Sequence, residues 1–233
     1  MDYKNLSKRL HRAGEFVPKG AILADIGSDH AYLPAYLVMN KQISSAIAGE
    51  VVDGPYLSAK NLVAELNLSS MIDVRKGDGL AVLTPLDEVS AISICGMGGA
   101  LIRDILDRGF HGGNLTGKET LILQPNIGEP TLRTWLVNHA YEIVKEDIIR
   151  ENEKTYEIIV AEKREQIVPL SEKELLFGPK LLEQQGSVFL NKWEHEYHQF
   201  ENILKQLEKS NKDVAKKIAE VETKIQLVKE VLA

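Results

Sequence analysis

One short segment, residues 22–34, holds residue types that could bind a ligand. An apolar run that includes Asp25 predicts a buried strand, and Gly27 allows a tight turn at the carboxyl end of that strand. Asp29 and His30 follow the turn and precede a helical pattern. Because ligands of open α/β sheets bind at this edge, the segment predicts a ligand site.

The glycine spacing around this turn narrows the class of ligand. It matches neither the G-x-G-x-x-G pattern of dinucleotide-binding loops nor the G-x-x-x-x-G-K-[ST] pattern of triphosphate-binding loops. One small residue flanked by carboxylates instead favours a ligand with a cationic end. S-adenosylmethionine is such a ligand, since it carries a sulfonium and an α-ammonium group.

Two further acidic residues follow the next predicted strands. Glu50 ends the second strand, where an acidic residue of nucleoside-binding Rossmann-like folds accepts hydrogen bonds from ribose hydroxyls. Asp78 and Gly79 follow the third strand, where an aspartate commonly meets the adenine amino group of such a cofactor. The alternatives are an exposed strand-end glutamate and an ordinary glycine-aspartate turn.

Three glycines within four positions follow the fourth predicted strand. Gly96, Gly98 and Gly99, with Met97 among them, leave bare backbone that a ligand can approach closely. Many amino-methylating nucleic-acid enzymes carry an Asn/Asp-Pro-Pro-aromatic tetrapeptide here, and its absence indicates a different target atom. Cys95 ends an apolar strand without an adjacent base, which favours packing over a nucleophilic role.

Polar side chains that could contact a substrate follow the first and fifth strands. Gln124 and Asn126 could read the edge of a base, although turn chemistry and helix capping explain the same residues. His30 could be a base, a base-reading donor or a helix-capping residue. Tyr32 could stack on an extruded base or pack on the sheet.

Apolar runs and helical patterns alternate up to about residue 160, which predicts a parallel sheet with right-handed crossovers. Only residues 151–155 separate the last two strands, so these strands should form an antiparallel hairpin. The expected strands are 21–26, 45–50, 72–76, 91–95, 120–124, 141–150 and 156–163, and the main helical patterns are 52–66, 100–108 and 129–139. This α/β order of seven strands is the Rossmann-like methyltransferase pattern.

The character of the sequence changes after residue 165, so we expect a Rossmann-like domain at 1–165 and a helical domain at 166–233. Two apolar stripes with steps of three and four run from Leu190 to Leu207 and from Val214 to Leu232. Polar residues 210–213 separate them, which predicts an antiparallel coiled-coil hairpin. A helical pair that packs only on itself and a partner-binding arm both fit this pattern.

The composition is that of a globular protein of 233 residues, with 44% hydrophobic and 27% charged residues. A single cysteine excludes an intrachain disulfide and a cysteine metal site. No stretch reaches the ~18 apolar residues of a membrane span, and the start lacks the apolar core of a signal peptide. We therefore expect a cytoplasmic protein without a metal. The coiled-coil hairpin can cover its own stripe, so the sequence does not determine the oligomeric state, and a monomer is favoured.

Charge is distributed unevenly along the chain. The net charge of −6 and the pI near 5.6 argue against indiscriminate binding to polyanions. The first twenty residues nevertheless carry a local excess of positive charge. This excess predicts a basic patch, with a solvated amphipathic helix as the alternative.

Four segments together resemble the TrmK family of bacterial tRNA adenine-N1 methyltransferases, which modify adenine 22 in the D-arm region. They are LSKRL at 6–10, ADIGSDHAYLP at 24–34, ICGMGG at 94–99 and QPN at 124–126. The resemblance covers nearly the whole chain and implies methyl transfer from S-adenosyl-L-methionine to tRNA. A methyltransferase of a small molecule or protein, and a non-catalytic binding module that uses the coiled coil, are the competing functions.

The residue patterns and the resemblance together predict three groups of site residues. The expected cofactor contacts are Asp25, Gly27, Ser28, Glu50, Asp78, Gly79, Gly96, Met97 and Gly98. The expected catalytic residues are Asp29, His30, Tyr32 and Asn126. The expected contacts to tRNA phosphates are Lys4, Lys8, Arg9 and Arg12.

The chemistry of adenine N1 sets what the catalytic residues must do. N1 has an in-plane lone pair, so no proton must be removed before methylation, and the ring becomes cationic as the bond forms. A carboxylate near the exocyclic amine would stabilise the transition state more than the ground state, and Asp29 is the expected group. Extruding the base costs roughly a few kcal/mol, and stacking on Tyr32 would offset ~1–3 kcal/mol.

Overall fold

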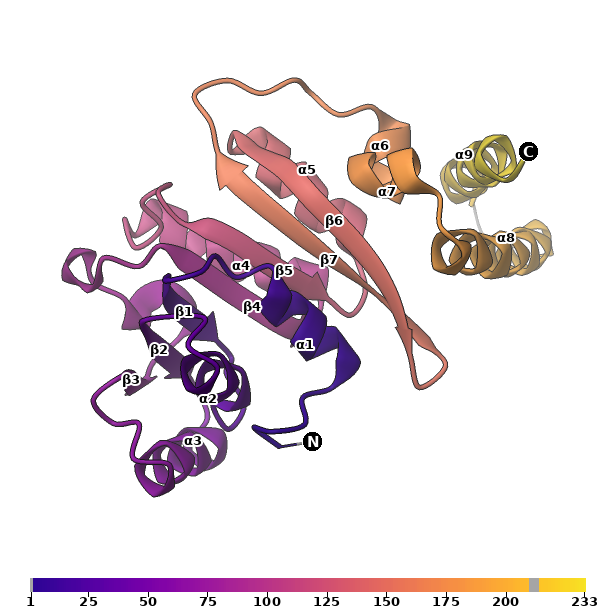
Figure 1. Cartoon of the computed structure of the whole chain (residues 1–233). Coiled ribbons are helices and arrows are strands. Elements are labelled where there is room, and N and C mark those ends of the chain that lie inside the picture. Colours follow the sequence, from indigo (N-terminus) through magenta and orange to yellow (C-terminus); the bar gives the residue numbers. More distant parts are fainter. Residues whose placement is uncertain (1, 210–213) are drawn as a thin grey trace. The chain divides into compact units, whose positions relative to one another are not determined.

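The computed structural model describes residues 2–209 and 214–233 and forms two compact units, Met1–Lys180 and Leu181–Ala233. The described part of the first unit contains a seven-stranded sheet in the order β3-β2-β1-β4-β5-β7-β6 (Figure 1). The strands are β1 (Ile22–Ile26), β2 (Ser45–Glu50), β3 (Ile72–Lys76), β4 (Ala91–Met97), β5 (Thr120–Pro125), β6 (Tyr141–Glu151) and β7 (Lys154–Lys163).

Strands β1 to β5 pair in parallel, whereas β7 runs antiparallel to both of its neighbours, β5 and β6. This arrangement confirms the predicted Rossmann-like sheet and its terminal hairpin. The observed strands differ from the expected ones only at their ends. Strand β4 continues beyond Cys95 because its register with β5 shifts there, so that Met97 pairs with Pro125.

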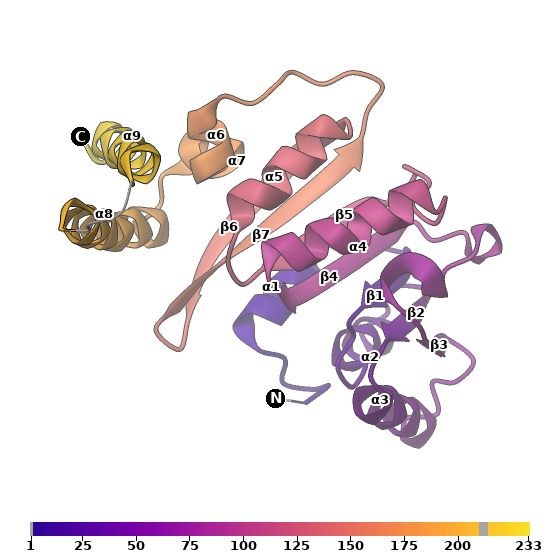
Figure 2. The same ribbon diagram turned by 180° about the vertical axis from the view of Figure 1, so that it is seen from behind.

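Helices cover both faces of the sheet. Figure 2 shows α4 (Gly99–His111) and α5 (Glu129–Asn138) on one face, and α1 (Lys8–Glu15), α2 (Tyr32–Met39) and α3 (Asp53–Glu65) lie on the other. Side chains alternate between two cores, since Leu121 and Leu123 pack with the α4 and α5 residues while Ile122 packs with the α2 and α3 residues. Two short 3₁₀ segments, η1 (Gly79–Val82) and η2 (Pro85–Asp87), follow β3.

The first unit also includes α6 (Glu172–Phe177), although the composition changes at residue 165. The reason is Arg133 of α5, which is fully buried and donates hydrogen bonds to the carbonyl oxygens of Leu175 (3.4 Å) and Leu176 (3.3 Å). These contacts hold α6 on the sheet domain. The compact units therefore divide after Lys180, further along the chain than the composition indicates.

Arg133 belongs to a buried ionic cluster with two carboxylates of the hairpin. Its Nε donates to Glu146 Oε1 (2.8 Å), and its Nη2 pairs with Glu157. The backbone N–H of Lys180 also donates to Glu146 Oε2 (2.9 Å), which ties the end of the first unit to β6. Burial raises the pKa of Glu146, and the charge of Arg133 opposes that shift.

The second unit consists mainly of α8 (Ser187–Glu208) and α9 (Ala215–Leu232), and α7 (Pro179–Gln184) spans the boundary. The Nζ atom of Lys224 lies 5.7 Å from the ring centroid of Phe200, and that of Lys229 lies 5.8 Å from the ring of Tyr197. This pairing shows that the two helices run antiparallel. Every residue of the two apolar stripes is buried or half-buried.

The predicted turn at 210–213 lies outside the described residues, and the coiled coil itself stays a prediction. Among the described residues, no helix has the length and apolar character needed to cross a membrane.

We expect Arg133→Met to destabilise the protein by about 3–5 kcal/mol, because it leaves two buried carboxylates without their cation. Urea denaturation at neutral pH measures this loss. The matched control is Arg164→Met, because Arg164 pairs with Glu142 and Glu162 at the surface and should contribute little. Similar losses for the two variants would contradict this account of the cluster.

Candidate active site

The predicted site residues gather where the strand order reverses. Strand β1 is flanked by β2 on one side and β4 on the other, so the connections after β1 and β4 leave the sheet in opposite directions. In open α/β sheets this reversal leaves a crevice outside the carboxyl ends of the strands. The segments that follow β1 and β4 are the two glycine-containing segments identified in the sequence.

Asp25 lies at the centre of this edge and is only 4% exposed. Its two carboxylate oxygens accept hydrogen bonds from Ser93 Oγ of β4 (2.5 Å) and Ser28 Oγ of the following turn (2.6 Å). Burial raises the pKa of Asp25 to about 6; the two serine hydrogen bonds oppose the shift and the charge of Glu50 adds to it. Asp25 thus joins β1, β4 and the turn.

The turn after β1 has an unusual backbone. Gly27 has a φ of +71°, and Asp29, His30 and Ala31 follow with φ values of +37°, +67° and +57°. Consecutive left-handed residues other than glycine are strained, and such strain clusters at functional sites. The backbone N–H of Asp29 donates to Glu50 Oε1 (2.7 Å), which holds the turn in this conformation.

Three of the four predicted catalytic residues lie in this turn or directly after it, where Tyr32 begins α2 and is half-buried. The Asp29 side chain is 63% exposed, and its Oδ1 lies 3.4 Å from Nε2 of His30. The His30 ring stacks on the Tyr32 ring, with centroids 5.2 Å apart and planes 11° apart. The result is a stacked pair of rings beside a carboxylate.

The glycine segment at the end of β4 (residues 96–99, the Gly96 loop) is hydrogen-bonded to Asn126, the fourth predicted catalytic residue, which directly follows β5. Asn126 Nδ2 donates to Gly96 O (2.7 Å), and its backbone N–H donates to Met97 O (2.7 Å). A Cβ on Gly27 would lie 2.0 Å from the Met97 Cε, so the Met97 side chain covers Gly27. Met97 therefore links the end of β4 to the turn after β1. Gly98 caps the start of α4.

Asp78 and Gly79 lie at the same edge, after β3. The N–H of Gly77 donates to Glu50 O (2.8 Å), which keeps this turn beside β2. The Asp78 side chain is exposed and accepts a hydrogen bond from Arg108 Nη2 (3.1 Å). Gly79 has a φ of +56°, and a Cβ there would lie 3.0 Å from Ile105 Cγ2.

The four predicted RNA-binding residues divide into two kinds. Lys4 and Lys8 are exposed. Arg12 pairs with Asp147 and Glu15, so its charge is largely balanced within the protein. Arg9 turns toward the Gly96 loop instead of toward solvent, as described below.

Comparisons with known proteins agree with this geometry. The family model described as TrmK, tRNA (adenine(22)-N(1))-methyltransferase, matches residues 23–230. A Bacillus subtilis protein of that description is 44% identical over 238 residues, covering 100% of this chain and 99% of the relative. The chain belongs to the TrmK family.

Two solved structures of similar proteins contain the cofactor or its product. A Streptococcus pneumoniae protein in complex with S-adenosyl-L-methionine is 45% identical and has a TM-score of 0.88, covering 98% of this chain and 100% of that one. Mycoplasma capricolum TrmK in complex with S-adenosyl-homocysteine is 28% identical and has a TM-score of 0.82, covering 97% of each chain. These two relatives therefore bind S-adenosyl-L-methionine and S-adenosyl-homocysteine, respectively.

The residues of this TrmK chain fit that cofactor. Glu50 and Asp78 offer carboxylates that can accept hydrogen bonds from hydroxyl and amino groups. The backbone at Gly27 has no Cβ, and only the flexible Met97 side chain stands over it. Among the described residues, His, Cys, Asp and Glu form no group of three that could hold a metal ion.

Cys95 is half-buried and packs against the core beside α2 and α3. Burial raises the pKa of its thiol, and the neighbouring Asp25 adds to that shift. Both effects disfavour the thiolate, in agreement with the packing role predicted for this residue.

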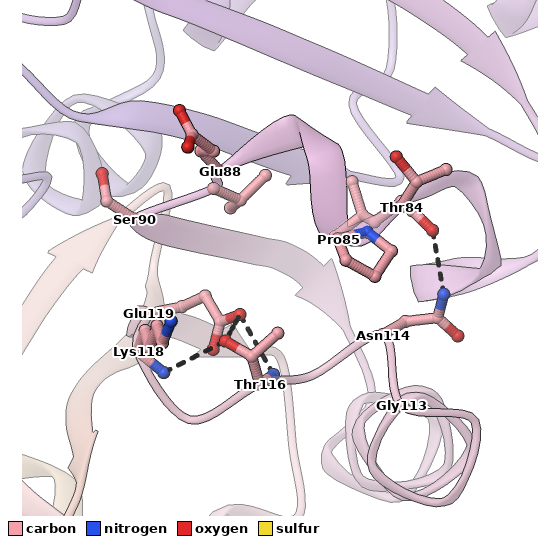
Figure 3. Close-up of a pocket in the computed structure, with 11 residues that line it drawn as sticks. Thr84, Pro85, Glu88, Ser90, Gly113, Asn114, Thr116, Lys118 and Glu119 are labelled. Atoms are coloured by element: carbon pink, nitrogen blue, oxygen red, sulfur yellow. Dashed lines mark hydrogen bonds between the residues drawn. The ribbon is translucent and has the colours of Figure 1, made fainter.

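A separate pocket of about 390 Å³ lies at the other end of the sheet (Figure 3). Its lining includes Ser90 and Glu119, which directly precede β4 and β5. The Glu119 carboxylate already accepts hydrogen bonds from Thr116 and Gly117. This pocket is at the amino edge of the strands, away from the TrmK site residues.

Sequence reasoning missed several residues that build the site. Ser93 had a readable signal, because a polar residue in the middle of an apolar strand needs a partner. The acidic residues of the β6–β7 hairpin gave no such signal. Glu151 accepts hydrogen bonds from the N–H groups of Lys8 (2.6 Å) and Arg9 (3.4 Å), and this pairing fixes the start of α1.

We expect Asp25→Asn to leave the protein at least as stable as wild type above pH 6 and to remove a pH dependence below it. The folded-state pKa lies above the ordinary value of 3.8, so the folded state binds the proton more tightly. The contribution of Asp25 to the free energy of unfolding therefore falls as the pH rises from about 4 to 6. Urea denaturation across this range, without cofactor, measures the slope.

The control for this experiment is Asp87→Asn, which should act in the opposite direction. Arg75 lowers the pKa of Asp87 to about 2, so the charged form stabilises the folded state at neutral pH. Loss of stability in Asp25→Asn at pH 7 comparable to that in Asp87→Asn would contradict the sign assigned to Asp25.

Proposed function

We propose that this chain transfers a methyl group from S-adenosyl-L-methionine to N1 of adenine 22 in bacterial tRNA. The observation that carries the proposal is the 44% identity to the Bacillus subtilis tRNA (adenine(22)-N(1))-methyltransferase over the whole chain. Since tRNA is the substrate, we infer a cytoplasmic location, and we favour a monomer because α8 and α9 pack on each other.

When bound, S-adenosyl-L-methionine supplies an electrophilic methyl group on a positively charged sulfur. We infer that Glu50 accepts the ribose hydroxyls, since its Oε1 takes the Asp29 N–H and a carboxylate has a second oxygen for them. Asp78 is the proposed partner of the cofactor's adenine amino group. Bare backbone at the carboxyl edge leaves room for the ligand, and the proposed contacts there are Asp25, Gly27, Ser28, Gly79, Gly96, Met97 and Gly98.

The target base gains positive charge as N1 is methylated, and Asp29 is the proposed group that stabilises it. A carboxylate that is 63% exposed beside the aromatic surface of His30 and Tyr32 can approach the exocyclic amine of a base stacked there. The interaction strengthens as the charge develops, so it lowers the barrier instead of only binding substrate. No general base is required for this reaction.

Asn126 is proposed to recognise the adenine. One of its Nδ2 hydrogens is engaged by Gly96 O, and its Oδ1 lies 3.4 Å from Gln124 Nε2. An asparagine amide reads adenine through the N6 amino group and N7, with about 1–3 kcal/mol of discrimination. Recognition at this edge leaves N1 accessible to the methyl group.

Affinity for tRNA is proposed to come from the start of the chain. Lys4 and Lys8 are exposed and lie before or at the start of α1, where their ammonium groups can contact phosphates. The overall charge of −6 makes such local charge necessary.

The test is methylation of purified bacterial tRNA with isotope-labelled S-adenosyl-L-methionine, followed by mass-spectrometric mapping of the product. We expect label at N1 of adenine 22 and loss of label when that adenine is replaced by guanine. The control is a cell extract freed of RNA, which should take up no label. Label in that extract would favour a small-molecule or protein substrate, and equal label in the guanine-substituted tRNA would contradict the assigned position.

We expect Asp29→Asn to lower turnover on the order of 10²-fold, because the charge that stabilises the transition state is lost. Cofactor affinity should persist, because the acceptor oxygen of the side chain is kept. Asparagine tolerates the positive φ of this position, so the turn should survive. Single-turnover kinetics and calorimetry with S-adenosyl-L-methionine measure the two quantities. Asp104→Asn on α4 is the matched exposed control, and near-normal turnover in Asp29→Asn would remove Asp29 from the chemistry.

A further inference from the structure

Arg9 is held inside the active-site edge, unlike the other basic residues near the start of the chain. Its Nη1 donates to Gln124 Oε1 (2.6 Å), and its guanidinium carbon lies 5.6 Å from the ring centroid of Tyr156. A Cβ on Gly96 would lie 3.1 Å from Nη1, so the guanidinium covers that glycine. Arg9 therefore contacts both the Gly96 loop and Gln124, which lies two positions before the proposed base-reading residue Asn126.

The contact with Gln124 determines which way its amide faces. Gln124 Oε1 accepts from Arg9 Nη1 and from the backbone N–H of Gly96 (3.1 Å). Both partners are donors only, so a flipped amide would place an NH₂ group against two donors. The Nε2 group must then face Pro125 O (2.8 Å) and Asn126 Oδ1 (3.4 Å).

The orientation of the Gln124 amide also sets the orientation of the Asn126 amide. Because Gln124 Nε2 is a donor, Asn126 directs Oδ1 toward it and uses Nδ2 to donate to Gly96 O (2.7 Å). The hydrogen bonds therefore run in one sense from Arg9 through Gln124 to Asn126. Removing the guanidinium removes the stronger of the two donors that select this arrangement.

We propose that Arg9 is a positioning residue for the methylation of the target adenine, acting through the amides of Gln124 and Asn126. This inference rests on the proposed function. It also changes the role predicted for Arg9 from the sequence, since its guanidinium serves the base-reading residue instead of a tRNA phosphate. Lys4 lies just before α1, and Arg9 is on α1. In this proposal α1 therefore links tRNA docking to base recognition.

The decisive experiment is a double-mutant cycle in the full-length protein. Arg9→Ala should lower kcat on the order of 10²-fold, with tRNA affinity and its salt dependence changed little. In an Asn126→Ala background, Arg9→Ala should change kcat by no more than about two-fold, since coupled residues are not additive. Arg9→Lys should restore only part of kcat, because one ammonium cannot reproduce the planar fork.

The matched control is Arg164→Ala, a surface arginine with carboxylate partners, which should leave kcat unchanged. If Arg9→Ala unfolds, Gln124→Glu replaces it, since a carboxylate keeps the Arg9 partner but cannot donate to Asn126. That variant should lose turnover, and because its second carboxylate oxygen faces the acceptors Pro125 O and Asn126 Oδ1, a thermal melt checks that it is folded at the assay temperature.

Three results would overturn the proposal. One is a full effect of Arg9→Ala in the Asn126→Ala background, which would make the two residues independent. Another is lower tRNA affinity with a reduced salt slope and normal kcat, which would make Arg9 a phosphate contact. The third is normal turnover in Gln124→Glu. Failure of the proposed function itself is distinguishable, because wild-type protein would then not methylate tRNA at all.

Discussion

The buried Asp25 carboxylate is the group on which the geometry of the site depends. It lies where the strand order reverses, and its hydrogen bonds to Ser93 and Ser28 fix the turn after β1 to the neighbouring strand β4. A buried carboxylate is costly, and the raised pKa of about 6 expresses that cost. A cationic ligand at this edge would favour the charged form. The cofactor proposed here carries positive charge, so its binding and the local stability should support each other.

The strained turn after β1 also shapes the site. Three left-handed residues cost about 1–2 kcal/mol each, and the sequence at Asp29, His30 and Ala31 contains no glycine that would avoid this cost. The Glu50 hydrogen bond and the complete burial of Ala31 offset it. In return, consecutive side chains leave the edge in directions that a regular strand or helix does not allow. A carboxylate and a stacked aromatic pair thus reach solvent within four positions, beside a glycine-lined backbone.

Much of the fold was predictable because it follows from local patterns. Apolar runs separated by helical patterns gave the parallel sheet, and the short connection after Glu151 gave the hairpin. The roles of Arg9 and Arg133 were not predictable, since both depend on partners far along the chain. Arg9 meets Gln124 across 115 positions, and a charged residue in an amphipathic helix ordinarily reads as exposed. For the same reason, the sequence did not show that Arg133 holds α6 on the first unit, so the expected boundary at residue 165 lies before α6.

Acidic residues of the β6–β7 hairpin explain how α1 could contact both the substrate and the site. Glu151 and Asp147 balance the start of α1 and the Arg12 side chain, so charge is neutralised where the helix meets the protein. Lys4 and Lys8 stay exposed beyond that contact, and Arg9 points inward between them and Arg12. Lys4 and Lys8, the proposed phosphate contacts, thus lie before or at the start of α1 in a chain whose net charge is −6. Under this proposal, a polyanion that engages this end of α1 binds the same helix whose Arg9 contacts Gln124, which would couple substrate docking to base recognition.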